Sequence, residues 1–202
     1  MKIAKHRETE KSEKLPVTKS KMHVGLGLQL PTAKLDAEGL IPPANAVLRI
    51  PYPMQLGQGT LALQPSITYI QENVNWSLGS QLKGNIQLAD NSEDYRPGSS
   101  AEGTVWVARN ISEKASVSFR LKGSIWGNVS GSDSDILPLP VPTTRTDLRG
   151  GFRFDAAIGL NLYNILGPLD AGVEISKPLY QNLEGPQLGR DWDVTLGLKY
   201  HW

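Results

Sequence analysis

The last eleven residues of the chain, Trp192–Trp202, alternate strictly between apolar and polar side chains. The apolar positions are Trp192, Val194, Leu196, Leu198, Tyr200 and Trp202. Because successive side chains of a β-strand point to opposite faces, this segment predicts a strand with one wholly apolar face. Both ends of that face are aromatic. An amphipathic terminal strand of this kind is typical of bacterial outer-membrane β-barrels.

Seven earlier segments show the same alternation, so the chain is expected to be all-β. They are Met22–Leu30, Leu61–Ile70, Val74–Leu88, Ser99–Ala108, Ala115–Val129, Leu148–Leu162 and Leu169–Ile175. Pro65 interrupts the second segment and cannot donate to a strand ladder, so the regular part of that strand is expected after the proline. The pattern predicts an antiparallel up-and-down meander of about eight strands.

The connections between these segments alternate in length. Short connections lie near residues 71–73, 110–114 and 164–168. Long ones cover about residues 31–60, 89–98, 130–147 and 176–191. Short turns on one side and long loops on the other are typical of periplasmic turns and extracellular loops. The sequence therefore predicts a transmembrane β-barrel, or the C-terminal part of a larger one, over residues 22–202.

Residues 1–21 differ from the rest of the chain. This segment is rich in charge and contains no apolar stretch, which predicts a disordered tail. A secretory signal requires an apolar region of roughly 7–15 residues. An outer-membrane protein needs such a signal, so we expect the sequence to be truncated at its N-terminus or its start to be wrongly assigned.

Composition narrows the possible functions. Lys and Arg number 21 against 20 Asp and Glu, for a net charge of +1, which argues against a nucleic-acid partner. The chain has no cysteine, which excludes disulfides, thiolate metal sites and cysteine catalysis. The three histidines, His6, His23 and His201, have no spacing that suggests a metal site or a catalytic triad. We therefore expect no enzyme activity, no catalytic residues, no metal and no cofactor.

The polar faces of the predicted strands carry charges of both signs. These residues are Lys83, Glu102, Arg120, Lys122, Arg153, Asp155, Glu174, Asp193 and Lys199. In a barrel they line the lumen, where mixed signs favour a salt-bridged network over a field that selects one ion. The alternative is an ordinary solvated sheet face.

Aromatic residues cluster near the ends of the predicted apolar faces. Tyr69, Trp76, Tyr200 and Trp202 fall near the periplasmic end, and Phe152, Phe154 and Trp192 fall near the outer end. Aromatic rings of membrane proteins favour the headgroup level, so these positions predict two aromatic girdles. The alternative is that the rings anchor the core of a soluble sheet.

The number of strands limits what a lumen could conduct. About eight strands leave an interior that side chains nearly fill, whereas an aqueous channel needs considerably more. Eight strands alone predict a plugged barrel, and a conducting barrel would need further strands.

Several segments of the chain resemble one protein family. They are Gly25–Thr32, Pro51–Thr60, Trp126–Asn128, Gly159–Tyr163 and Tyr180–Leu188. Over about residues 22–202 the chain resembles the C-terminal part of the bacterial outer-membrane transporters grouped with the MetA protein of phenol-degradation pathways. The resemblance implies an outer-membrane barrel and uptake of small, often aromatic, compounds. It implies no catalytic residues.

These observations together predict an outer-membrane β-barrel that acts as a passive transporter or channel. Its expected partners are outer-membrane lipid and small-molecule solutes. One alternative is a structural or partner-binding barrel with a filled lumen. Another is a soluble barrel that binds an apolar ligand and turns its charges outward. The last is a nonfunctional fragment of a longer gene.

Overall fold

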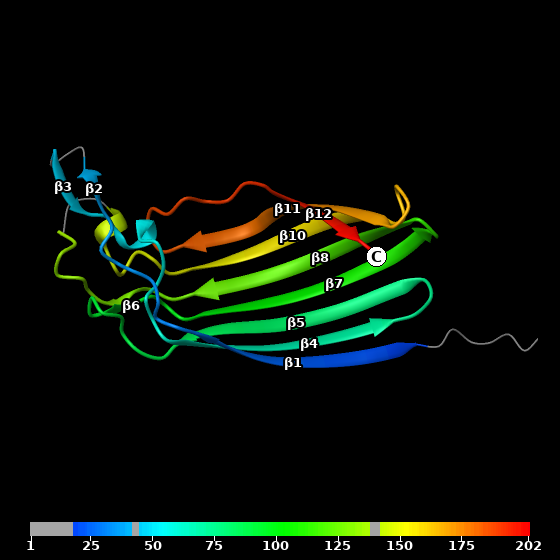
Figure 1. Cartoon of the computed structure of the whole chain (residues 1–202), viewed down its shortest axis with the longest axis horizontal. Helices are drawn as coiled ribbons and strands as arrows, with labels where there is room; N and C mark the ends of the chain where they lie inside the picture. The colour runs from blue at the N-terminus through cyan, green and yellow to red at the C-terminus, as the bar shows by residue number, and fades with distance from the viewer. Residues whose placement is uncertain (1–17, 42–44, 138–141) are drawn as a thin grey trace, which may run out of the picture.

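A computed structural model describes residues 18–41, 45–137 and 142–202 (Figure 1). It confirms an all-β fold built on one antiparallel, eight-stranded meander. The eight strands in sheet order are β1 (Lys19–Gln29), β4 (Ala62–Glu72), β5 (Trp76–Gln87), β7 (Ser100–Ser112), β8 (Ala115–Trp126), β10 (Gly151–Leu162), β11 (Leu169–Leu183) and β12 (Asp193–Tyr200). No helix among the described residues is long and apolar enough to cross a membrane.

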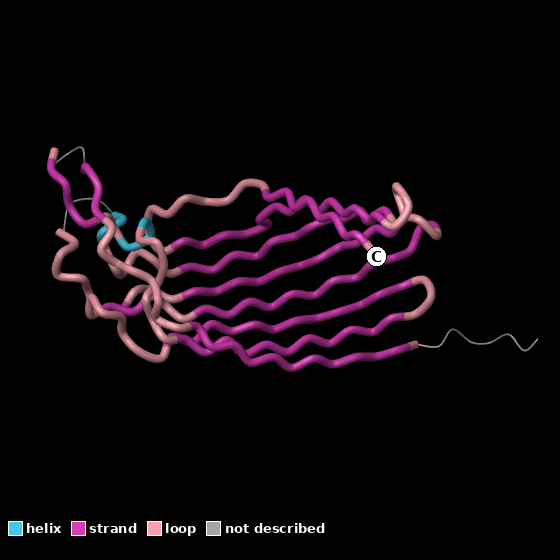
Figure 2. The backbone as a smooth tube through the Cα atoms, in the orientation of Figure 1, coloured by secondary structure: helices cyan, strands magenta, loops and turns pink. Residues whose placement is uncertain are grey.

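The connections separate the two ends of the sheet. Short turns lie at one end, which we call the turn end, and all long connections gather at the other, the loop end (Figures 1 and 2). The loop end also contains the small structural elements of the chain. These are the two-stranded sheets β2 (Glu38–Ile41) with β3 (Ala46–Arg49) and β6 (Tyr95–Arg96) with β9 (Ser130–Gly131), and the 3-10 turns η1 (Tyr52–Met54) and η2 (Pro142–Thr144).

The sheet is open. Strands β1 and β12 form its two edges, and no ladder joins them in the described part of the chain. The eight strands therefore do not close into a barrel by themselves, contrary to the first of the two forms that the sequence predicted. The second form, a part of a larger barrel, stays a prediction.

Several strand boundaries differ from the sequence prediction, among them the end of β7, which runs to Ser112 where Ala108 was expected. Strand β1 begins at Lys19, inside the segment predicted as a tail, whereas residues 1–17 lie outside the described residues. Strand β4 begins at Ala62, ahead of Pro65. That proline lies opposite Leu26 of β1, and the β4–β5 ladder is interrupted beside it, as expected next to a residue that has no N–H to donate.

Strand β11 extends to Leu183, so half of the predicted loop 176–191 is strand. A register shift between Phe154 and Asp155 accommodates the extension, because Phe154 lies opposite Tyr180 and Asp155 opposite Pro178. The ladder with β12 ends at Ser176. Pro178 therefore has no neighbour strand on that side, where a proline is tolerated.

The two faces of the sheet reverse the usual relation between polarity and exposure. Leu26, Ile158 and Leu196 on the apolar face are 73%, 68% and 77% exposed. On the opposite, polar face, Thr104 and Asp155 are only 8% and 4% exposed. A water-soluble sheet buries its apolar face instead. The medium against the apolar face is therefore the main question that this fold raises.

Close packing on the polar face involves Gly79 and Trp106, which are paired across β5 and β7. A Cβ atom on Gly79 would lie 2.1 Å from a carbon of the Trp106 ring. We expect Gly79→Ala to displace the indole and to lower the free energy of unfolding by about 1–3 kcal/mol, the usual effect of overpacking. Urea unfolding followed by tryptophan fluorescence measures this change.

The matched control is Gly197→Ala in β12, where an added Cβ meets nothing within 4 Å. We expect this variant to change the free energy of unfolding by less than about 0.5 kcal/mol. Equal effects of the two substitutions would contradict the packing of Trp106 on Gly79.

Candidate functional site

The polar face carries a shared carboxylate at its centre. Glu102 of β7 lies between two cations, with Lys83 Nζ at 2.9 Å from β5 and Lys122 Nζ at 3.7 Å from β8. The ladders explain the arrangement, because Lys83 is directly opposite Glu102 and Lys122 is opposite the neighbouring Thr104. The three side chains are partly exposed, so they can exchange partners with a solute.

Two further ion pairs continue this network. Arg120 of β8 pairs with Glu174 of β11, reaching past β10. Within β10, Arg153 Nε contacts Asp155 Oδ2 at 3.0 Å, and the Asp155 side chain is only 5% exposed. Seven of the nine predicted lumen residues thus pair with one another, as the mixed signs suggested. Their role in lining a lumen stays a prediction.

The other two predicted residues lie on β12 and do not join the network. Asp193 pairs instead with Arg190, at 3.4 Å, in the preceding connection. Lys199 lies opposite Asp170 in the ladder. The carboxylate of Asp170 contacts His201 Nε2 at 2.7 Å. The charge network is therefore concentrated on the middle strands, from β5 to β11.

A hollow of about 660 Å³ opens on the polar face toward the loop end. Its lining includes Lys83, Asn85, Glu102, Ser124, Trp126 and Arg153. Two buried atoms in this lining, Asn85 Oδ1 and Ser124 Oγ, have no hydrogen-bond partner in the structure. The hollow thus offers both charges and unused acceptors to a small polar solute.

Trp126 belongs to this hollow but was absent from the predicted site. Its Nε1 donates a hydrogen bond to Arg149 O at 3.0 Å, and the Arg153 guanidinium lies 5.8 Å from the ring centre. The alternation of side chains in β8 predicts that Trp126 lies on the polar face, because it has the same phase as Arg120 and Lys122. The predicted lumen residues were all charged, so this tryptophan was not included among them.

An arginine at the loop end binds three acidic residues from other connections. Arg49 Nη1 lies 2.9 Å from Glu93 Oε2 and 3.2 Å from Asp133 Oδ2, and its Nη2 lies 2.9 Å from Asp135 Oδ2. We call these four residues the Arg49 cluster. Burial alone would lower the pKa of the guanidinium, but the hydrogen bond to Glu93 and the carboxylate charges outweigh it and raise that pKa.

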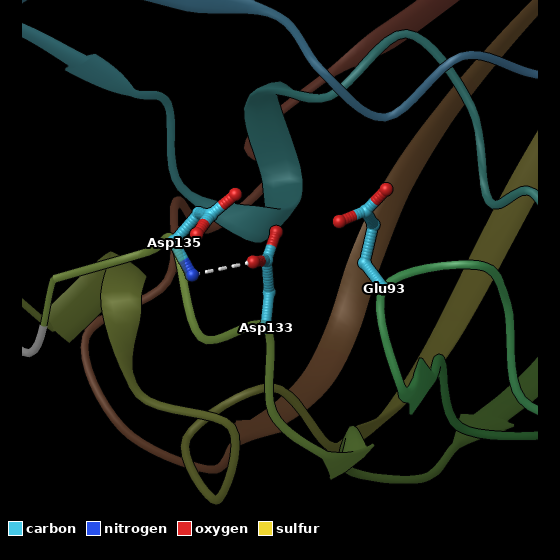
Figure 3. Close-up of side chains that lie close together, drawn as sticks. All are labelled: Glu93, Asp133 and Asp135. Carbon is cyan, nitrogen blue, oxygen red and sulfur yellow. Dashed lines mark hydrogen bonds between the residues drawn. The ribbon is translucent and has the colours of Figure 1, made fainter.

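Figure 3 shows how the three carboxylates approach one another, with a hydrogen bond from the Asp135 N–H to Asp133 Oδ1 at 2.8 Å. One oxygen atom from each carboxylate lies within 4.8 Å of the other two, close enough to bind a cation. The Arg49 guanidinium already neutralises part of this charge. Asp133 and Asp135 are close in sequence, but Glu93 is 40 residues before Asp133 and Arg49 a further 44 before Glu93, so no motif spacing reveals the cluster.

The cluster joins three long connections across the loop end. The hydroxyl of Tyr52 accepts a hydrogen bond from the Asp133 N–H at 3.2 Å, and its ring packs edge-on against Tyr95 at 4.8 Å. Burial raises the pKa of both phenols. The β1–β4 connection thereby reaches over to the β8–β10 connection and covers part of the loop end.

A second set of contacts fixes residues 58–60 to the end of β5. The buried Thr60 Oγ1 donates to Gln87 Oε1 at 2.6 Å, and Gln87 Nε2 donates to Gln58 Oε1 at 2.9 Å. Asn91 Nδ2 donates to the backbone oxygen of Gln58 at 3.1 Å. The described part of the long β1–β4 connection is therefore attached at two places and covers part of the loop end.

We expect Arg49→Gln to loosen this cover, because it leaves three carboxylates facing one another without a cation. Removing one partner of a buried ion pair usually costs about 3–5 kcal/mol. Hydrogen exchange of residues 46–60 should accelerate by at least about tenfold, which corresponds to about 1.4 kcal/mol. Unchanged exchange rates would contradict the structural role of the cluster.

Arg145→Gln is the control for that experiment. Arg145 forms its ion pair with Asp147 in the same connection as Asp133, but both side chains are well exposed. Exposed pairs contribute little, so we expect the exchange rates of residues 46–60 to stay unchanged.

The predicted aromatic residues lie mainly at the ends of the apolar face. Near the turn end, the Arg109 guanidinium lies 5.1 Å from the Trp76 ring centre. Trp192 was expected near the outer end, but it lies just before β12, where Lys177 Nζ, about midway along β11, lies 4.9 Å from its ring centre. Tyr69, Phe152, Tyr200 and Trp202 are also exposed, whereas Phe154 is half-buried and lines an apolar hollow.

Sequence reasoning missed Tyr180, which was placed in a loop. In the structure it belongs to β11, and its ring centre lies 6.1 Å from that of Phe152. The extra length of β11 therefore adds a ring to the loop end of the apolar face. Whether these rings form membrane girdles stays a prediction.

Comparisons with protein-family models, with curated proteins and with solved structures found no match. The resemblance to MetA-type transporters therefore stays a prediction from the motifs. What the structure itself defines is a class of architecture. It is an open antiparallel meander with an exposed apolar face, an ion-paired polar face and one covered end.

Proposed function

We propose that this chain forms the wall of a transmembrane β-barrel in a bacterial outer membrane, and that its polar face lines a passive route for small polar solutes. The exposed apolar face is the observation that supports this proposal most strongly. Leaving a large aliphatic side chain in water forgoes roughly 1.5–3 kcal/mol of burial energy. Hydrocarbon around the sheet removes that cost for Leu26, Ile158, Leu196 and their neighbours together.

The dimensions of the sheet fit this environment. A tilted strand crosses a bilayer with about 9–11 residues. Strands β4, β5 and β10 have 11, 12 and 12 residues. Trp76 with Arg109 at the turn end is an amphipathic pair of the kind that favours the headgroup level, which supports the proposal.

The polar face suggests which solutes pass. Its charges are mixed in sign and mostly paired, so it presents no strong field of one sign. Small neutral or zwitterionic molecules with hydrogen-bonding groups match such a lining better than bulk salt ions. The resemblance to MetA-type proteins is in line with uptake of small compounds.

Planar-bilayer recording tests the proposed route. Protein refolded from detergent into a phosphatidylcholine bilayer should produce discrete conductance steps. Protease protection on vesicles prepared from the same lipid establishes insertion independently. Silent bilayers that contain demonstrably inserted protein would contradict a passive route.

One observation favours a second candidate, a barrel with a structural or partner-binding role. The Arg49 cluster and the hydrogen bonds of Thr60 keep an ordered cover over part of the loop end. If that cover seals the lumen, the protein inserts without conducting. Opening the cover with Arg49→Gln should then create conductance steps, whereas a passive route conducts before the substitution.

A further inference from the structure

We propose that the hollow on the polar face binds small hydroxylated monocarboxylates, with Arg153 as the residue that holds the carboxylate. The inference rests on the proposed function and names the class of solute that this part of the lining selects. The hollow has a volume of about 660 Å³, within the range of small-molecule sites. Its lining includes a row of paired residues across β5, β7, β8 and β10. Lys83 lies opposite Glu102 in this row. Ser124 follows, with Glu102 on one side and Arg153 on the other.

The Arg153 guanidinium is held in place from two sides. Its Nε donates to Asp155 Oδ2 at 3.0 Å, and the Asp155 side chain is largely buried. Its other neighbour is the ring of Trp126, whose Nε1 is itself fixed by the hydrogen bond to Arg149 O. In the described part of the chain this guanidinium makes no other hydrogen bond. Both Nη groups are therefore available to a carboxylate, which arginine binds through two parallel hydrogen bonds.

The charges around the hollow favour a ligand with one negative charge. Lys83 and Lys122 share the single carboxylate of Glu102, and Arg153 pairs with Asp155. Three cations thus face two carboxylates, which leaves one positive charge in excess. One excess charge creates no selective field along the whole polar face, but at the hollow it lies next to the bound solute. A monocarboxylate balances it, whereas a phosphate monoester carries about −1.5 to −2 charges and exceeds it.

The unpartnered polar atoms of the hollow favour hydroxyl groups on that ligand. Asn85 Oδ1 and Ser124 Oγ are buried and have no hydrogen-bond partner among the described residues. Asn85 Oδ1 can only accept, so it requires an O–H or N–H group from the ligand, toward which the soft χ2 torsion can turn the amide. An ammonium group there would be repelled by Lys83, so a hydroxyl fits better. Ser124 is next to Arg153 in the row and can donate its own hydroxyl to the carboxylate.

Gluconate, sorbitol and acetate test this assignment, because they separate the carboxylate from the hydroxyl groups. Gluconate has a carboxylate where sorbitol has a hydroxymethyl group, and acetate has the carboxylate alone. Each compound is titrated into refolded protein in detergent micelles at low salt and followed by isothermal titration calorimetry. We expect gluconate to bind at least about tenfold more tightly than either of the others, because each of them lacks one set of hydrogen bonds.

Three variants locate the binding. Arg153→Lys keeps the charge beside Asp155 but removes the planar fork, so gluconate affinity should fall at least about tenfold. Ser124→Ala removes one hydroxyl without changing any charge and should weaken gluconate about threefold. Arg145→Gln is the control, because it removes an exposed cation outside the hollow and should leave gluconate affinity unchanged.

The outcomes separate this inference from the proposed function. Sorbitol or acetate binding as tightly as gluconate would overturn it, because the site would then need only one of the two chemical groups. Gluconate binding that survives both Arg153→Lys and Ser124→Ala would lie elsewhere and would also overturn it. Selective gluconate binding with silent bilayers would support the site and contradict the passive route. Conductance steps without selective binding would overturn the site alone.

Discussion

Leu196→Arg should lower the free energy of unfolding of the bilayer-inserted chain by about 2–4 kcal/mol, the cost of arginine facing lipid at mid-depth in a barrel. Leu196 lies in the middle of β12 and is 77% exposed on the apolar face. If hydrocarbon contacts that face, the guanidinium loses its hydration there. Reversible urea unfolding in phosphatidylcholine vesicles measures the change.

Thr195→Arg is the matched control, because it adds the same charge one residue away on the opposite face. Thr195 lies opposite Glu174 in the ladder with β11, so the new cation meets water and a carboxylate. We expect a change below about 0.5 kcal/mol. In a water-soluble sheet an exposed leucine tolerates arginine as well. Equal and small effects of the two substitutions would therefore contradict a lipid-facing surface.

Glu102→Gln should shift the ion preference of the conducting barrel toward anions. The substitution removes the carboxylate that Lys83 and Lys122 share and leaves two cations on the lumen surface. A unit charge about 6 Å from a passing ion in a water-like medium changes its energy by about 0.7 kcal/mol, or about threefold in permeability ratio. Reversal potentials in a gradient of potassium chloride measure that ratio, and the shift should decrease at high salt.

The control for this experiment is Glu113→Gln in the exposed turn between β7 and β8. It changes the net charge of the chain by the same amount without touching the polar face. We expect its reversal potential to equal that of the parent protein. A shift as large as that of Glu102→Gln would mean that the recording reports surface charge and not a lumen residue.

The alternation of side chains was sufficient to predict the strands and their faces. A period of two is local, so stretches such as residues 76–87 and 193–200 reveal both the strand and its apolar side without tertiary information. The division into short turns and long connections likewise follows from counting residues between the strands. The paired charges of Lys83 and Glu102 follow from neighbouring strands in a simple meander.

Other features depend on contacts that sequence spacing does not reveal. The Arg49 cluster joins Arg49 to carboxylates 44 to 86 positions later in the chain through the packing of three connections. The length of β11 depends on a register shift that allows Pro178 within a strand, where proline normally indicates a loop. The separation of β1 from β12 is a property of the whole sheet, which no single strand encodes.

The medium against the apolar face is tested most directly by a spin-label scan of β12. Single cysteines at positions 193–200 would carry nitroxide labels in phosphatidylcholine vesicles, and collisions with oxygen and with a water-soluble nickel complex would be compared. We predict a period of two, with oxygen dominating at Val194, Leu196 and Leu198, and nickel dominating at Asp193, Thr195 and Gly197. Nickel dominating at Val194, Leu196 and Leu198 would contradict the proposal that hydrocarbon contacts this face.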